Sequence, residues 1–252
     1  MQKRAIFSVS YIGVISSLLI IMLFTWSCSD NDTVMPGPDE EEEQEDNGGE
    51  FTWGKACDDM PTIDYEDQDY HTVKIGDQCW LRENLNVGTM IESTEEMTDD
   101  SIIEKYCHDN DPANCEIYGG LYQWDEAMGY TKAEGAQGIC PPGWHIPTKE
   151  DWQELEEFLG DHAGGKLKAP YDWYEPNTGA TNSTGFSALP GGHRGGACTL
   201  FYNLGREGRW WTSSEQSTNG AWRQTMYHDS DTLNLNPNFK YYGISVRCVR
   251  SG

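Results

Sequence analysis

The sequence predicts an α+β domain in which short, mostly antiparallel strands and long loops surround one or two helices, with disulfides between them. Three features carry this prediction. One segment has the periodicity and the cap of a helix, several short apolar runs are separated by glycines, and cysteines are scattered along the chain. With 252 residues, of which 37% are apolar and 12% aromatic, the chain is able to bury a core, which excludes global disorder.

The clearest helix begins at Thr148 and ends before Gly160. Asp151 lies three residues after Thr148, which is a capping box with Asp in the place of Glu. The apolar residues that follow share one face of the helix: Trp152, Leu155, Phe158 and Leu159. A second, shorter helix is expected within residues 119–128.

Strands are expected where short apolar runs meet turn residues. Residues 70–75 and 78–84 flank Gly76-Asp77, so they are predicted to form a hairpin. Later strands are expected within the apolar runs at residues 186–189, 209–213, 221–227 and 244–249. In the last run Val246 and Cys248 are two residues apart, which favours a buried C-terminal strand.

The N-terminus predicts export. Lys3 and Arg4 precede an apolar run over residues 5–26, and Ser27-Cys28 then places a small residue directly before a cysteine. Lipoprotein signal peptides are cleaved at this arrangement, and the cysteine is acylated. We therefore expect residues 1–27 to be a lipoprotein signal peptide and Cys28 to be the lipid anchor. The alternative is an uncleaved membrane anchor, because the run is long enough to span a bilayer.

Residues 28–50 are predicted to be the lipidated cysteine and an acidic tether. Residues 29–32 (SDND) resemble the acidic signal that sends lipoproteins of Bacteroidetes-type bacteria to the outer face of the outer membrane. Residues 39–46 hold seven carboxylates and no base, so this segment cannot bury apolar surface and is extended by self-repulsion. The expected location is therefore the cell surface, at the outer membrane.

The charge of the chain excludes one class of partner. Its formal net charge of −25 disfavours nucleic acid, because binding nucleic acid needs a basic face that neutralises phosphates. It equally disfavours docking on an anionic membrane by charge alone. The N-terminal lipid is therefore the expected link to the membrane.

Cysteine usage fits export. Without Cys28, the eight cysteines leave seven, and none of these forms C-x-x-C or a His/Cys cluster with zinc-site spacing. In an oxidising compartment most of them are expected to pair, with one left over. The sequence by itself leaves the pairing open.

Six segments resemble, in order, the Fibrobacter succinogenes major paralogous domain family. They include TVKIGDQCWLRENL at 72–85, GGLYQWDEAM at 119–128 and GICPPGWHIPTKEDWQELEEFLG at 138–160. The other three segments are residues 176–196, 209–215 and 243–250. The resemblance implies a C-type-lectin-like fold over residues 51–252, distantly similar to formylglycine-generating enzymes. It does not imply a known activity.

The resemblance also implies a disulfide pairing. The expected bridges are Cys57–Cys79, Cys107–Cys115 and Cys140–Cys248. Cys198 is then the cysteine left over, and it is expected to be a small buried hydrophobe.

Two functions that the resemblance suggests are weakly supported by the residues. For calcium-dependent sugar binding, Glu175 and Asn177 are the candidate ligands, but Glu175-Pro176-Asn177 lies earlier than the lectin tripeptide, and Trp222 is not followed by Asn-Asp. We therefore predict no cofactor. For catalysis, Cys198 has no second cysteine for a copper pair, so no catalytic residue is predicted and the chain is expected not to be an enzyme.

The remaining hypothesis is a binding module that works through aromatic side chains. Aromatic faces stack on sugar rings and anchor protein interfaces. The candidate ligand-binding residues are Trp173, Trp210, Trp222 and Tyr241. Because adjacent residues on a strand point to opposite faces, we expect Trp210 to point outward and Trp211 inward. The predicted function is recognition of a glycan or protein ligand on the cell surface; the alternative is a structural or adhesive envelope component without a small ligand.

Overall fold

The computed structural model describes residues 54–57, 60–196 and 199–251. The predicted signal peptide, the lipid anchor Cys28, the acidic tether and Cys198 all lie outside these residues. Within the described part of the chain, no helix combines the length and the apolar character needed to cross a bilayer.

The first of two main sheets joins the two ends of the domain. Its strand order is β1-β2-β3-β13, and all of its pairs are antiparallel. The strands are β1 (Thr62–Tyr65), β2 (Gln68–Ile75), β3 (Gln78–Leu81) and β13 (Val249–Ser251). The predicted hairpin around Gly76 is confirmed as β2 and β3, although β3 is shorter than expected.

The second sheet has the strand order β11-β10-β9-β12-β6. Its strands are β6 (Leu121–Tyr122), β9 (Glu207–Ser217), β10 (Gly220–Tyr227), β11 (Asn234–Phe239) and β12 (Ile244–Ser245). β9 and β10 form a long hairpin, and β11 lies beside β10 at the sheet edge. Two minor pairs complete the strands: β4 (Thr89–Met90) with β5 (Glu104–Lys105), and β7 (His193–Arg194) with β8 (Phe201–Tyr202).

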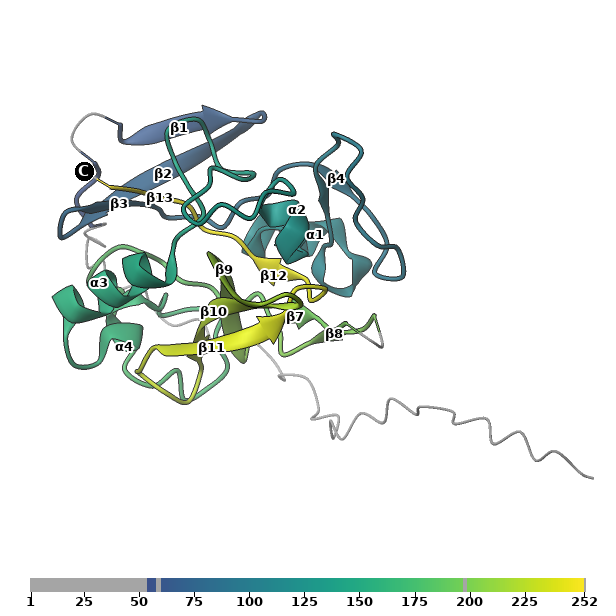
Figure 1. The fold of residues 1–252 in the computed structure, drawn as a ribbon. Coiled ribbons are helices and arrows are strands. Elements are labelled where there is room, and N and C mark those ends of the chain that lie inside the picture. The colour runs from purple at the N-terminus through teal and green to yellow at the C-terminus, as the bar shows by residue number, and fades with distance from the viewer. Residues whose placement is uncertain (1–53, 58–59, 197–198, 252) are drawn as a thin grey trace, which may run out of the picture. The chain divides into compact units, whose positions relative to one another are not determined.

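The described residues contain four α-helices, two more than the sequence predicted at most. They are α1 (Pro112–Tyr118), α2 (Trp124–Ala127), α3 (Lys149–Leu159) and α4 (Ala163–Leu167), with a 3₁₀ turn at His108–Asn110. Figure 1 shows α3 and α4 at one end of the sheets, and α1 and α2 near β4 at the other. α1 and α4 were missed because helices this short show no readable periodicity.

The predicted capping box of α3 is confirmed. The Thr148 hydroxyl accepts from the Asp151 backbone N–H at 3.0 Å, and the Thr148 N–H donates to the Asp151 carboxylate at 2.7 Å. Trp152 and Leu155 are buried, as expected, but Phe158 is exposed. Its ring lies instead over Gly76 in the β2–β3 turn, where a Cβ atom would come within 3.1 Å of it and where φ is +61°.

Two of the predicted later strands differ from expectation. Residues 186–189 form only an isolated bridge, between Ala188 and Lys168. The run at 244–249 is divided into β12 and the first residue of β13, with Val246 and Cys248 buried between them. The predicted strands at 209–213 and 221–227 are confirmed within β9 and β10.

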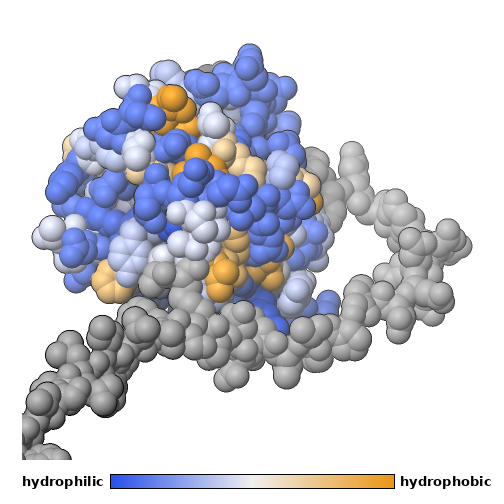
Figure 2. All heavy atoms as spheres, turned by 90° about the vertical axis from the view of Figure 1, so that its right-hand side faces the viewer, coloured by the Kyte–Doolittle hydropathy of each residue, from blue (hydrophilic) through white to orange (hydrophobic). Residues whose placement is uncertain are grey.

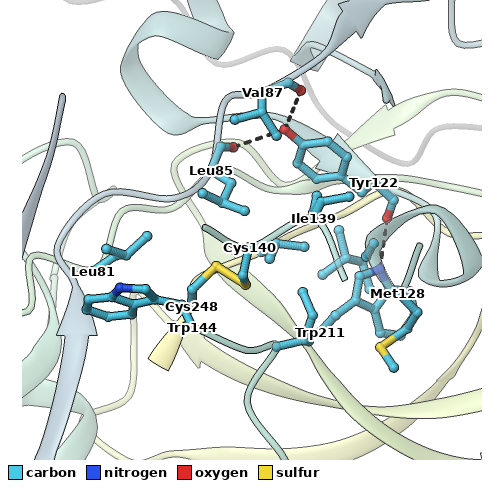
Figure 3. Packing of buried hydrophobic residues seen from close by; sticks show 14 of the residues in the cluster. Leu81, Leu85, Val87, Tyr122, Met128, Ile139, Cys140, Trp144, Trp211 and Cys248 are labelled. Carbon is cyan, nitrogen blue, oxygen red and sulfur yellow. Dashed lines mark hydrogen bonds between the residues drawn. A yellow bond between two sulfur atoms is a disulfide. The ribbon is translucent and has the colours of Figure 1, made fainter. Parts of the chain in front are cut away.

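The core consists of two main clusters of buried residues, one mainly between the sheets and α2, the other beneath α3 and α4. Figure 3 shows the first, in which the Tyr122 hydroxyl donates to the Val87 carbonyl at 2.9 Å and Trp211 Nε1 donates to the Tyr122 carbonyl at 2.8 Å. These bonds satisfy polar groups that would otherwise be costly to bury.

Among the residues that the structure describes, three disulfides stabilise this arrangement, and they are the predicted pairs. Cys57–Cys79 ties the entry segment to β3, and Cys107–Cys115 closes a local loop onto α1. Cys140–Cys248 joins segments that are 108 residues apart and lies inside the first core cluster (Figure 3).

Candidate functional site

Two of the four predicted ligand-binding aromatics lie in the core. Trp210 is 0% exposed, and its Nε1 donates to the Asn84 side-chain oxygen at 2.7 Å. The prediction that Trp210 points outward is therefore wrong. Both faces of β9 are covered: Trp210 packs against Trp152 of α3, with ring centroids 6.2 Å apart, while Trp211 enters the other core cluster.

Trp173 is also buried. Its Nε1 donates to the Ala188 carbonyl at 2.9 Å, and the ammonium of Lys168 lies 5.2 Å from its ring centroid. Burial lowers the pKa of Lys168 to about 8, because the surroundings disfavour its charge. Trp173 thus belongs to the structural core.

The other two predicted residues lie at the surface. Trp222 is half-buried on β10, and the ammonium of Lys149 lies 5.1 Å from its ring centroid. Tyr241 is 43% exposed. The ring of Phe239, which the sequence analysis did not single out, is 53% exposed beside Tyr241.

We call Phe239 and Tyr241 the aromatic platform. Their ring centroids are 5.2 Å apart and their planes differ by 7°, so the two rings stack on each other at the end of β11, and Tyr241 also stacks on Tyr242. The face of the domain in Figure 2 is mostly hydrophilic, with small separate hydrophobic patches. Isolated exposed apolar residues are ordinary, whereas two adjacent exposed rings offer a contact surface.

The local sequence explains why both rings point outward. Phe239 ends β11, and Lys240 and Tyr241 lie in the turn that follows it, where Lys240 is buried and the two aromatics on either side of it are exposed. The Lys240 ammonium lies 3.8 Å from the Trp124 ring centroid and pairs with the Glu215 carboxylate. Because the Lys240 ammonium finds partners inside the protein, the Lys240 side chain lies inward. The side chains of Phe239 and Tyr241 on either side of it lie at the surface.

The backbone of the platform is held at several points. The Tyr241 carbonyl accepts from Arg194 at 3.1 Å and from Gln123 at 3.2 Å. The Tyr242 N–H donates to the Phe239 carbonyl at 3.2 Å, which closes a turn. These contacts place the platform on a scaffold that is ordered before any ligand arrives.

Two hollows flank the platform and share Phe239. The larger, of about 410 Å³, is lined by both platform rings and by Gln123, Asp125, Thr218, Asn219 and Lys240. The smaller, of about 200 Å³, is lined by Phe239 and by Gln216, Ser217, Gly220, Pro237 and Asn238. The side-chain Nδ2 of Asn238 is buried and has no hydrogen-bond partner within the described residues. The site thus combines aromatic faces with amide, hydroxyl and carboxylate groups.

The sequence analysis missed Phe239 because β11 (NLNPNF) lacks the alternation of a half-buried strand. A usable signal was present, namely a lysine between two aromatics at the end of that segment. Pro237 fits the position of β11 at the edge of the sheet, since proline cannot donate to a neighbouring strand.

The calcium candidates do not come together with further ligands. Asn177 donates its side-chain Nδ2 to the Ala169 carbonyl at 3.1 Å, and Glu175 is exposed. In the part of the chain that the structure describes, no group of three or more His, Cys, Asp or Glu side chains is arranged to hold a metal ion. Independence from calcium stays a prediction, which the experiment below tests.

A buried ionic cluster near the platform is a second feature that the sequence analysis missed. Glu207 Oε1 lies 2.7 Å from His193 Nδ1 and 2.7 Å from Arg209 Nε. Burial raises the pKa of Glu207, but the contact with His193 and the charge of Arg209 outweigh burial and hold that pKa at about 2. Burial lowers the pKa of His193. His193 also stacks on Tyr242, and Tyr242 stacks on Tyr241 of the platform. The ionic cluster therefore contacts the platform through Tyr242.

The fold and this site define a disulfide-bonded domain of mixed strands and short helices with an exposed aromatic surface. The chain belongs to the Fibrobacter succinogenes major domain family, whose sequence model matches residues 73–250. Comparison with curated proteins and with solved structures gives no match.

Proposed function

We propose that the protein is a lipoprotein of the outer-membrane surface whose domain, of C-type-lectin-like fold, binds a glycan without catalysing a reaction. The aromatic platform is the binding surface. The lipoprotein part rests on the N-terminal sequence, and the lectin-like part rests on the family, on the pairing of β3 with β13 and on the long loops between them.

The observation that carries the proposal is the exposed, parallel pair Phe239 and Tyr241 between two polar hollows. Sugar rings have apolar C–H faces and polar edges. An aromatic face removes the C–H face from water, while amides and carboxylates bond the hydroxyls at the edge. Asp125, Asn219 and Asn238 supply such groups on the two sides of Phe239.

The arrangement favours a chain of sugars over a single sugar. The two hollows meet at Phe239, so a ligand that fills both must pass across its ring. We therefore expect an oligosaccharide of at least two adjacent units, with one unit on each side of Phe239.

A glycan array probed with the full-length protein tests the proposal, once in calcium and once in chelator. We expect binding to an oligosaccharide in both buffers, and we expect Phe239→Ala and Tyr241→Ala to abolish the signal. Phe158→Ala is the matched control, because Phe158 is an exposed phenylalanine (64%) on α3 and lines neither hollow.

Three results would speak against the proposal. Binding that chelator removes would assign recognition to a metal site and not to the platform. Binding that survives both platform substitutions would place the glycan elsewhere. Absence of binding in either buffer would favour a protein partner or a structural role in the envelope.

A further inference from the structure

A separate pocket lies between the β2–β3 hairpin, α1 and the loop that contains Tyr171. It has a volume of about 280 Å³, and we call it the α1 pocket. None of its lining residues contributes to the two hollows at the platform. Its chemistry also differs, because its wall contains four charged side chains.

The wall of the α1 pocket is net negative. It contains three carboxylates, Asp69, Glu83 and Glu116, and one guanidinium, Arg82, which leaves two negative charges (three minus one). Arg82 is held against the wall, since its Nε donates to the Gly185 carbonyl at 3.1 Å. Beneath the pocket, burial raises the pKa of Tyr70 to about 12, and the charges of Glu83 and Glu116 add to that rise. The charges of both carboxylates therefore influence the Tyr70 hydroxyl at the floor of the pocket.

The three carboxylates are engaged to different extents. Glu83 is fixed by His71, whose backbone N–H lies 2.8 Å and whose Nδ1 lies 3.0 Å from its oxygens. Glu116 has a long contact of 3.5 Å with Asn86, and its charge also interacts with the ammonium of Lys105, which donates to the same Asn86 side chain at 2.7 Å. Asp69 is exposed and is thus the carboxylate best able to take a new partner, followed by Glu116, whose hydrogen bond is long.

Aromatic rings complete the rim. Tyr118 and Tyr171 both line the pocket, and Tyr171 is 45% exposed. Carboxylates beside aromatic faces form the combination that attracts a cation, through charge-assisted hydrogen bonds and through the negative faces of the rings.

The α1 wall is held in place before a ligand binds. The Cys107–Cys115 disulfide anchors α1 one residue before Glu116. Asn84 donates its side-chain Nδ2 to the Tyr118 carbonyl at 2.8 Å, and the Gly119 N–H donates to the Cys115 carbonyl at 2.9 Å. The last turn of α1 is therefore fixed relative to β3.

We propose that the α1 pocket binds a positively charged group of a ligand, a protonated primary amine or a guanidinium, between its carboxylates and its tyrosine rings. The cationic group enters the pocket and takes Glu116 and Asp69 as partners. The source of the group is either the side chain of a basic residue or an amino sugar.

Calorimetric titration of the full-length protein tests this proposal with small probes. Nα-acetyl-lysine amide and Nα-acetyl-arginine amide represent basic residues, and glucosamine represents amino sugars. The neutral counterparts are the Nε-acetylated lysine probe and N-acetylglucosamine. At least one charged probe is expected to bind, more weakly at high ionic strength, while its neutral counterpart does not.

Charge-removing variants assign the binding to the α1 pocket. Asp69→Asn and Glu116→Gln are each expected to weaken binding about threefold, and the double variant about tenfold. Glu156→Gln removes one charge from the exposed side of α3 and is expected to leave the dissociation constant unchanged. Phe239→Ala should also have no effect, which separates this site from the platform.

The proposal is overturned if no charged probe binds, if neutral and charged probes bind equally, or if the double variant binds as the wild type does. Binding of the lysine or arginine probe alone would assign the source to a protein partner, and binding of glucosamine alone to a glycan. Either result supports the binding of a positively charged group in the α1 pocket.

Discussion

At the scale of single residues, the separation of core aromatics from surface aromatics decides where a ligand can bind. Trp210 and Trp173 have satisfied indole N–H groups inside the core, whereas the side chains of Phe239 and Tyr241 are about half exposed. Composition identifies these residues as aromatic but does not separate the two groups. The separation depends on which faces of β9 are covered, and that is a property of the tertiary structure.

The first prediction contrasts the two groups by stability. Trp210→Ala is expected to lower the free energy of unfolding by about 3–5 kcal/mol, since it opens a cavity in the core and removes the indole donor that shares the Asn84 side-chain oxygen with Arg247. Tyr241→Ala is expected to lower it by less than about 1 kcal/mol, because the ring is partly exposed. Urea unfolding of both variants measures this, and equal losses would mean that the platform belongs to the core.

The second prediction concerns acid stability at Glu207. Its folded pKa of about 2 lies below the ordinary 4.5, so its contribution is present above pH 4.5 and is lost as the pH falls toward 2. The shift of the Glu207 pKa from 4.5 to about 2 corresponds to roughly 3 kcal/mol of the free energy of unfolding. The lowered pKa of His193 acts in the same direction, because the unfolded chain takes up a proton below pH 6.5 before the folded chain does. The wild type is therefore expected to lose stability throughout this acidic range.

Glu207→Gln tests the assignment. The variant should be less stable than the wild type at pH 7, and the difference should shrink as the pH falls from 4.5 toward 2. Urea unfolding across this range provides the measurement, with Glu156→Gln as the control at an exposed carboxylate. A constant difference between variant and wild type would assign the acid sensitivity to other groups.

At the scale of elements, local signals predicted some parts well and others poorly. α3 was found because its capping box and apolar face agree, and β2 and β3 because a glycine turn divides them. α1 was missed although it has a readable start: Asp111 caps it, accepting from the Ala113 N–H at 2.9 Å, and Pro112 follows at its first position. β11 was missed because its partner β10, and not its own sequence, makes it a strand.

The third prediction concerns the disulfides. In the chain-entropy account, Cys140–Cys248 closes a segment of 108 residues and stabilises the fold by about 4–5 kcal/mol. Cys107–Cys115 spans 8 residues and is worth about 2–3 kcal/mol. Thermal unfolding of the two paired Cys→Ser variants compares them. A larger loss for the short bridge would show that local geometry outweighs loop length.

At the scale of the whole molecule, the family and the three disulfides followed from the order of segments along the chain. The position of the site did not, because Gln123, Asn219 and Tyr241 meet only when β6, the β9–β10 turn and the end of β11 come together. The α1 pocket likewise unites Asp69, Glu116 and Tyr171 from three separate segments. Such juxtapositions cannot be read from the spacing of residues in the sequence.

The fourth prediction concerns display. Labelled palmitate is expected to be incorporated into the wild type. It is not expected to be incorporated into Cys28→Ser, which lacks the cysteine that is acylated. Protease added to intact cells is expected to cut the wild-type domain from the surface. Resistance of the domain on intact cells, with cleavage after lysis, would place it inside the envelope.

The most direct test of the central claim is calorimetric titration of an oligosaccharide identified on the array into the wild type, Phe239→Ala, Tyr241→Ala and the control Phe158→Ala. The account predicts that each platform variant loses at least about tenfold in affinity, or about 1.4 kcal/mol. The free energy of unfolding of each variant is expected to fall by less than about 1 kcal/mol, and the affinity of the control is expected to stay unchanged. Equal affinity in all four proteins would contradict the claim that Phe239 and Tyr241 form the binding surface.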